Sequence, residues 1–353
     1  MNKEKILNYF ENSFLKDLLE DSEITDISYN GKDIYYLHNH NGRQMFFHNQ
    51  SRDNIKDFVR QLANLSERQF SFSSPVLDIS FDKYRFTALH QCIGKLDNDD
   101  VITFSVRIAS KHIHITKDSD FFSKPVGELI DVLVKSKVSI VIGGITGSGK
   151  TEFQKYLLSR MPDYTRVIVI DNVLELDMRG DNDLLDLNIW QADERNKNTT
   201  IQFLIKTALR SNPDWLIVAE SRGEEMIDVL NSAMTGHPII TTLHAFDAES
   251  MPHRMTSMVM MNDKKMSRED ILQDILYHFR IFFFLKREIT PQGKVKRYLT
   301  SIVEFDGENK NIIYEKRGDE HYYGKLSNNL LKILDYEDDN DDFILNFVGG
   351  EQL

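Results

Sequence analysis

The chain has 353 residues, of which 41% are hydrophobic and 28% charged, and this composition fits a globular chain of about two domains. A net charge of −12 argues against a broadly basic surface, so no direct sequence-specific nucleic-acid binding is expected. The single cysteine, Cys92, excludes an internal disulfide framework, and the lack of a secretory signal or of an apolar run near the roughly 20 residues that span a bilayer predicts a cytoplasmic location.

The first 110 residues alternate short helical and strand patterns. Apolar residues repeat at helical spacing in two stretches, and short apolar strands flank an Asn30-Gly31 turn and a polar loop over 95–100. The expected helices are 6–19 and 54–65, and the expected strands are 24–29, 34–37, 85–89 and 101–108. We therefore predict an α+β N-terminal domain over residues 1–110, built on one small mixed sheet.

A polar stretch over 111–125 that ends with Pro125 is predicted to be a linker, and a helix is expected at 126–135. Beyond it, apolar strands are separated by helical segments, which is the pattern of a mostly parallel sheet covered on both faces. The expected strands are 138–142, 167–170, 215–219, 239–243 and 279–285. An α/β domain with a C-terminal extension is therefore predicted over 126–353, with an acidic, solvated stretch at 336–342 and a hydrophobic end at 343–348 that docks.

A phosphate-binding motif directly follows the strand 138–142. Residues 144–151 read GITGSGKT and fit G-x-x-x-x-G-K-[ST], in which glycines let backbone N–H groups surround an anion at a helix N-terminus. A glycine-rich turn that only connects strand to helix is the alternative. The motif predicts that Lys150 reaches the β- and γ-phosphates of ATP and that Thr151 holds Mg²⁺. The other predicted nucleotide contacts are Gly144, Thr146, Gly147, Ser148 and Gly149.

Carboxylates follow two more of the expected strands, at the ends where ligands collect in parallel sheets. Glu220 closes the strand 215–219 and is our candidate for the catalytic carboxylate that orients or deprotonates the attacking water. Asp171 and Glu175 follow the strand 167–170 and are candidates for positioning the nucleophile. Glu220 and Asp171 are also expected to bind the metal through water. Capping of a strand or of the next helix is the alternative for all three.

Two histidines flank the strand 239–243. His244 follows it and His237 lies in the turn before it, and each is expected to contact a γ-phosphate or a neighbouring carboxylate unless its role is structural. The i, i+2 spacings among His38, His40, His48, His112 and His114 do not predict a metal site, because no acidic or cysteine partners complete one.

Taken in order, these motifs resemble the secretion ATPases of type II and type IV systems, most closely the CpaF-like and VirB-type branch. Residues 209–223, LRSNPDWLIVAESRG, are similar to the family's Walker B region, L-R-x-x-P-D-x-[IL]-[IL]-V-G-E-x-R-G. Residues 235–245 resemble its histidine box, 171–175 its acidic box, and 23–31 the start of its N-terminal domain.

The resemblance implies a RecA-like P-loop ATPase domain with a mostly parallel sheet, preceded by a smaller α+β domain. It also implies a homo-oligomeric ring, usually of six subunits, with ATP bound between the two domains and hydrolysis driving their relative motion. Arg85 and Arg107 fall where family members place arginines facing the nucleotide, although solvated strand charges are the alternative. Arg222 and His237 are expected nucleotide contacts as well. The implied partners are inner-membrane secretion or pilus platform proteins at the cytoplasmic face of the membrane.

Three positions depart from the family pattern. Ala219 replaces a glycine before the Walker B glutamate, Asn172 replaces an aspartate, and Glu152 replaces a small hydroxyl residue. None removes a group that the chemistry requires, so the expected function is a motor ATPase of a secretion, pilus or conjugation machine. A nucleotide-gated assembly scaffold with negligible turnover is the alternative, and a small-molecule kinase is disfavoured because no acceptor pocket or lid is recognisable. The sequence does not indicate whether the transported cargo is a pilin, another protein or DNA.

Overall fold

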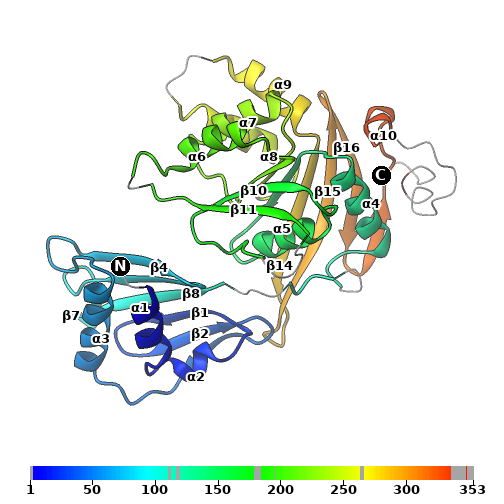
Figure 1. The fold of residues 1–353 in the computed structure, drawn as a ribbon. Coiled ribbons are helices and arrows are strands. Elements are labelled where there is room, and N and C mark those ends of the chain that lie inside the picture. The colour runs from blue at the N-terminus through cyan, green and yellow to red at the C-terminus, as the bar shows by residue number, and fades with distance from the viewer. Residues whose placement is uncertain are drawn as a thin grey trace. The chain divides into compact units, whose positions relative to one another are not determined.

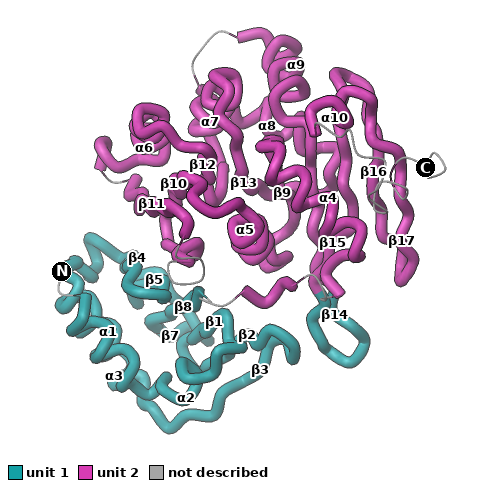
Figure 2. Tube along the Cα trace, turned by 45° about the vertical axis from the view of Figure 1, so that its right-hand side comes forward, with its two compact units in different colours: residues 1–112, 288–296 teal, residues 113–287, 297–353 magenta. Residues whose placement is uncertain are grey.

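The structure, a computed structural model, describes residues 3–109, 113–116, 120–178, 184–194, 196–262, 266–334 and 347. The chain forms two compact units (Figure 2). Unit 1 comprises residues 1–112 and 288–296, and unit 2 comprises residues 113–287 and 297–353. The chain therefore returns to unit 1 once, through a short segment of the sheet hairpin described below.

Unit 1 is a six-stranded antiparallel sheet in the order β3-β2-β1-β8-β5-β4 (Figure 1). Its helices are α1 (Lys3–Glu11), α2 (Lys16–Leu19) and α3 (Arg52–Leu65), and its strands are β1 (Ile24–Tyr29), β2 (Ile34–His38), β3 (Gly42–Phe46), β4 (Val76–Phe81), β5 (Tyr84–Leu89) and β8 (Thr103–Ile108), with the small hairpin β6 (Lys95–Leu96) and β7 (Asp99–Asp100). Apolar side chains of the helices and of the sheet form one core. The segment 288–296 joins this unit, since the Val295 N–H donates to the His40 carbonyl at 3.1 Å.

Two predictions for this unit were wrong. The expected helix 6–19 is two helices, because Asn12 Nδ2 bonds to the Asn8 carbonyl at 2.8 Å and the Leu15 N–H to Ser13 Oγ at 3.2 Å, which offers the backbone an alternative to the helical ladder. The sheet is antiparallel rather than mixed. Its strands β1 to β3 and β4 to β5 are joined by short turns, which only antiparallel pairing allows.

Unit 2 is built on a nine-stranded sheet in the order β11-β10-β12-β13-β9-β14-β15-β16-β17. The pairs among β11, β10, β12, β13, β9 and β14 are parallel, and β15, β16 and β17 pair antiparallel. The strands are β9 (Ile140–Gly144), β10 (Arg166–Asp171), β11 (Asp186–Gln191), β12 (Trp215–Val218), β13 (Ile239–Leu243), β14 (Ile281–Ile289), β15 (Val295–Asp306), β16 (Asn309–Arg317) and β17 (Glu320–Tyr323). The helices are α4 (Lys124–Lys135), α5 (Lys150–Ser159), α6 (Ile201–Ala208), α7 (Met226–Met234), α8 (Met251–Val259), α9 (Arg268–His278) and α10 (Asn328–Ile333), with a 3₁₀ turn η1 (Leu209–Ser211).

Both faces of this sheet are buried. Alternate residues of one strand enter different cores: Ile140 and Ile142 of β9 pack with α4 and α5, whereas Val141 packs with α6 to α9 (Figure 1). This explains the near-continuous apolar runs from which the strands were predicted. The predicted fold class, an α/β sheet of mostly parallel strands preceded by a smaller α+β unit, is confirmed.

The antiparallel edge of unit 2 was not predicted. The strands β16 and β17 are rich in charged and half-buried residues, and only Ile313 and Tyr314 of them are buried, so they lack the apolar run that marks the parallel strands. The predicted acidic tail 336–342 lies outside the described residues. Of the hydrophobic end 343–348 only Phe347 is described, and it is fully buried against Tyr323.

A buried carboxylate joins this edge to α10. Glu304 of β15 is 0% exposed and accepts hydrogen bonds from Asn311 Nδ2 at 3.0 Å, the Ser327 N–H at 3.0 Å and Ser327 Oγ. Ser327 is also the N-cap of α10, because its Oγ accepts from the Leu330 N–H at 3.0 Å.

We predict that Glu304→Ala lowers the free energy of unfolding by about 3 kcal/mol, since it leaves buried donors without an acceptor. Glu304→Gln keeps one acceptor oxygen and should cost about half as much. Urea denaturation measures both, with the exposed Glu308→Gln as control. A Glu304→Ala protein as stable as the control would contradict this role.

Candidate functional site

The phosphate-binding loop lies between β9 and α5, as the motif predicted. Gly147 and Gly149 have φ angles of +75° and +96°, which residues with a side chain rarely adopt, so the loop geometry requires glycine at both positions. The loop ends at the N-terminus of α5, where free backbone N–H groups and the helix dipole favour an anion.

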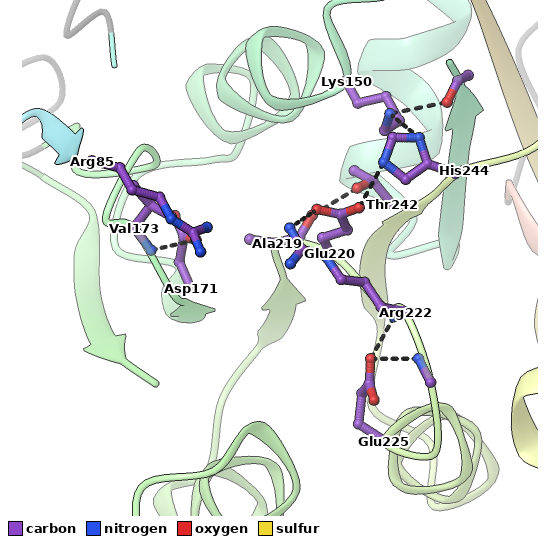
Figure 3. A network of polar contacts seen from close by, with 12 residues as sticks. Arg85, Lys150, Asp171, Val173, Ala219, Glu220, Arg222, Glu225, Thr242 and His244 are labelled. Atoms are coloured by element: carbon purple, nitrogen blue, oxygen red, sulfur yellow. Dashed lines mark hydrogen bonds and ion pairs between the residues drawn. The ribbon is translucent and has the colours of Figure 1, made fainter. Parts of the chain in front are cut away.

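Lys150, the first residue of α5, is 9% exposed and folds back over the loop. Its Nζ donates to the Gly144 carbonyl at 2.9 Å and the Ile145 carbonyl at 3.2 Å, and it lies 3.3 Å from His244 Nδ1 (Figure 3). Ser148 Oγ is buried and has no hydrogen-bond partner among the described residues. A buried ammonium and an unpaired hydroxyl beside a helix N-terminus fit the phosphates of a nucleotide.

The strand order brings the predicted residues together. Because β13 lies between β9 and β12 and all three are parallel, their carboxyl ends meet at one edge of the sheet. Lys150 follows β9, His244 follows β13 and Glu220 follows β12. His244 Nε2 lies 3.0 Å from Glu220 Oε1, so the histidine stands between the lysine and the carboxylate. Since an ammonium only donates, Nδ1 is the acceptor in the contact with Lys150, and Nε2 faces Glu220.

The backbone around Glu220 is pinned to β13. Thr242 Oγ1 donates to the Ala219 carbonyl at 2.8 Å, the Ser221 N–H donates to the Thr242 carbonyl at 2.8 Å, and Ser221 Oγ lies 2.8 Å from Thr241 Oγ1. These contacts fix the direction in which the Glu220 side chain leaves the strand. These hydrogen bonds form although alanine replaces the family's glycine at position 219.

Cations surround the Glu220 carboxylate. Arg222 Nη2 donates to Oε2 at 2.6 Å, while Oε1 lies near His244 but has no hydrogen-bond partner among the described residues. Burial alone would raise the pKa of Glu220, but the Arg222 hydrogen bond, the Arg222 charge and the neighbouring His244 and Lys150 outweigh it and lower the pKa. The group is therefore an ionised carboxylate at neutral pH with one oxygen open to a donor.

Asp171 ends β10 at the same edge. Its Oδ1 accepts from the Val173 N–H at 3.1 Å and its Oδ2 from the Glu175 N–H at 2.8 Å. Burial raises the pKa of Asp171, although these backbone hydrogen bonds oppose the rise. The carboxylate thus caps the turn that follows β10, and its metal-binding and catalytic roles stay predictions, as does that of Glu175.

The remaining predicted nucleotide contacts lie outside the Lys150–His244–Glu220 row, and their roles stay predictions. His237 precedes β13 and so lies at the opposite end of that strand from His244, where its Nδ1 is 3.1 Å from Thr235 Oγ1. Thr146 is exposed and Thr151 half-buried. In unit 1, Arg85 pairs with Asp78 at 3.2 Å.

Glu152, one of the family departures, has a structural contact. Its carboxylate accepts from the His114 N–H and lies 3.6 Å from Lys155 Nζ. Asn172, another departure, contributes its carbonyl, which accepts from Gln191 Nε2 at 3.2 Å. Neither of these contacts involves the Lys150–His244–Glu220 row.

Two arginines at this edge were not predicted as site residues. Arg287 of β14 and Arg297 of β15 lie beside the phosphate-binding loop. The signal for Arg287 was its position two residues after the apolar run 279–285, although β14 continues past it to Ile289. Arg297 gives no such signal, because it precedes rather than follows the apolar residues of its strand.

Among the described residues, no group of three or more His, Cys, Asp or Glu side chains is placed to hold a metal ion. Magnesium commonly keeps several waters and binds through few protein ligands plus substrate phosphates, so Thr151 with a nucleotide remains a reasonable site for it. No helix in the described part of the chain is long and apolar enough to cross a membrane.

Comparisons with known proteins show the family of the chain. The family model described as "Type II/IV secretion system protein" matches residues 105–283. An uncharacterized protein of Bacillus anthracis is 27% identical over 315 residues, covering 84% of this chain and 68% of that protein. The type IV secretion system protein VirB11 of Brucella suis is 34% identical over 142 residues, which is 39% of each chain, so the chain matches well under two thirds of that relative.

A likeness in fold extends over most of the chain. The X-ray structure of the Legionella pneumophila ATPase DotB superposes with a TM-score of 0.62 at 18% identity, and covers 83% of this chain and 80% of that one. At this identity the match shows a shared fold.

The pKa of Glu220 predicts how stability depends on pH. Because its folded pKa lies below the ordinary value of 4.5, ionised Glu220 stabilises the fold above pH 4.5, and this contribution is lost as the pH falls through and below that value. The stability advantage of the wild type over Glu220→Gln should therefore shrink between pH 7 and pH values below 4.5.

Urea denaturation at several pH values, without nucleotide, measures this difference. Glu224→Gln, an exposed glutamate four residues away, is the control and should show no such trend. An advantage that is constant or grows on acidification would show that the cations around Glu220 do not stabilise its charge.

Proposed function

Because the chain belongs to the type II/IV secretion system protein family and is an ATPase, we propose that it is the Mg²⁺-dependent motor of a membrane secretion, pilus-assembly or conjugative transfer machine. The observation that carries the proposal is the row Lys150–His244–Glu220 at the carboxyl ends of adjacent parallel strands. In this row a lysine suited to bind phosphate and a carboxylate suited to orient water lie on either side of one histidine, which supports the proposal.

Separate groups bind the phosphates, the metal ion and the attacking water. The loop N–H groups, the α5 N-terminus and Lys150 hold the β- and γ-phosphates, for which Lys150 gives up its contacts with the Gly144 and Ile145 carbonyls. Thr151 holds Mg²⁺, which when bound offsets the charge of the phosphate oxygens. Glu220 accepts a hydrogen bond from the attacking water at Oε1. Its lowered pKa makes it a weak base, so it orients the water more than it removes a proton.

Arg222 and His244 act on Glu220. Arg222 binds Oε2 and leaves Oε1 to face the water. His244 contacts both Lys150 and Glu220, so a phosphate that draws Lys150 away from Nδ1 alters the histidine that borders the carboxylate. This is the role as a nucleotide sensor that the position of His244 after β13 suggested.

Arg85 and Arg107 of unit 1 are proposed as further nucleotide contacts. They lie directly opposite each other on β5 and β8, and Asp26 of β1 is opposite Arg107 on its other side. Carboxylates already lie near both, because Arg85 also pairs with Asp78 at 3.2 Å, so the support for this role is the resemblance to family members that place arginines here facing the nucleotide.

We further propose that the protein works as a homo-oligomeric ring, of six subunits, at the cytoplasmic face of the membrane. Its partners would be the membrane proteins of the secretion or pilus machine. Membership of the family and the resemblance to its VirB-type branch support this assembly.

Turnover tests the proposed activity. Purified protein should hydrolyse ATP only with Mg²⁺, and Lys150→Ala and Glu220→Gln should each lower kcat/KM by about 100-fold or more, because phosphate binding and water orientation are lost. Glu224→Gln is the matched control, since it removes an exposed carboxylate from the same segment and should leave turnover unchanged. Equal rates for the wild type and Glu220→Gln, with tight ATP binding, would instead support a nucleotide-gated scaffold.

Assembly is a separate prediction. Glu220→Gln keeps Lys150 and the loop, so it should bind ATP without consuming it and accumulate as a ring. Sedimentation velocity with Mg-ATP should show a species of several subunits that Lys150→Ala does not form. A monomer under all nucleotide conditions would overturn the ring.

A further inference from the structure

The phosphate-binding loop has a second neighbour on the side away from His244. In the sheet order, β14 lies next to β9 on the side opposite β13, and Leu285 of β14 pairs with Gly144. Arg287 follows two residues later, so it extends past the end of β9 beside the loop. The hairpin then turns through the Thr290 and Gly293 backbone hydrogen bonds and returns as β15, which brings Arg297 to the same place.

Arg297 holds the loop itself. Its Nε donates to the Gly147 carbonyl at 2.8 Å, and its Cδ lies 3.7 Å from the position that a Cβ on Gly149 would take. The tip of the loop is therefore already bound by one arginine through a backbone acceptor.

Arg287 lies against the same tip without such a bond. Its Cδ and Nη1 are each 3.6 Å from the position of a Cβ on Gly147. Its Nε is buried, and Arg287 makes no hydrogen bond or ion pair with any residue in the described part of the chain. A buried N–H donor is costly unless an acceptor satisfies it. The Gly147 carbonyl accepts from Arg297, and no described residue accepts from the Arg287 Nε.

We propose that Arg287 binds the phosphates of the nucleotide from the β14 side of the loop, opposite Lys150 and His244. The inference rests on the proposed function, since it adds a residue to the same nucleotide site. A planar guanidinium offers two parallel donors to phosphate oxygens, which suits a phosphate group held between a loop and a strand end. The phosphate site is then built from both neighbours of β9, with Lys150 and His244 on one side and Arg287 on the other.

Nucleotide affinity tests this role. Arg287→Met keeps an unbranched side chain but removes the guanidinium group. Displacement of a fluorescent ATP analogue should show that it weakens the binding of both ATP and ADP about tenfold or more. Arg287→Lys keeps the charge and should recover part of the loss. Lys296→Gln, which removes an exposed positive charge on the same hairpin, should bind as the wild type does.

Thermal unfolding separates binding from packing. Arg287→Met should unfold at the wild-type temperature without nucleotide but show a smaller rise in Tm when ATP is added, because the ligand-induced rise depends on affinity. Equal losses for Arg287→Met and Arg287→Lys, or a lower Tm without nucleotide and an unchanged ligand-induced rise, would show that Arg287 only packs against the loop.

The two proposals fail in different ways. If the wild type binds ATP, Lys150→Ala binds it weakly and Arg287→Met binds it as the wild type does, the role of Arg287 is wrong and the ATPase site stands. If neither the wild type nor Lys150→Ala binds ATP, the proposed function fails, and the role of Arg287 fails with it.

Discussion

The position of β13 between β9 and β12 is the constraint on which the site depends. In a parallel sheet the strands deliver the residues that follow them to one edge, and the order of the strands decides which residues become neighbours. With β13 between them, the phosphate-binding lysine and the carboxylate are one strand apart, and His244 fills the interval. Had β12 paired directly with β9, no residue would stand between Lys150 and Glu220.

The charges of this row balance one another. A half-buried carboxylate would be poorly solvated alone, yet Arg222, His244 and Lys150 hold its pKa below the ordinary value. The same contacts make the row responsive, because Lys150 bonds to loop carbonyls and to His244, and phosphate oxygens are stronger acceptors for an ammonium than either. We therefore expect binding at the loop to change the surroundings of Glu220 through one histidine.

The sequence predicted those parts of the fold and site that follow a buried strand. Glu220 and His244 were identified because each comes directly after an apolar run, and Lys150 because it belongs to the phosphate-binding motif that follows one; strand ends converge in a parallel sheet. The same rule did not show that Asp171 caps its own turn, since backbone N–H groups compete for a carboxylate at a strand end. His237 was predicted as a nucleotide contact from the turn before the strand 239–243, and that turn is at the opposite end of β13 from His244. The contact of Arg297 with Gly147 joins residues 150 positions apart through an edge hairpin of mixed polarity, and no local pattern reports it. The CpaF-like assignment within the family stays a prediction.

The most direct test of the account is an experimental structure of the protein with Mg²⁺ and a non-hydrolysable ATP analogue. The account predicts that Lys150 Nζ leaves the Gly144 and Ile145 carbonyls for the β- and γ-phosphates, and that Glu220 Oε1 faces the γ-phosphate across a water. A nucleotide bound away from residues 144–151, or a Lys150 that keeps its loop contacts while Glu220 points elsewhere, would contradict it.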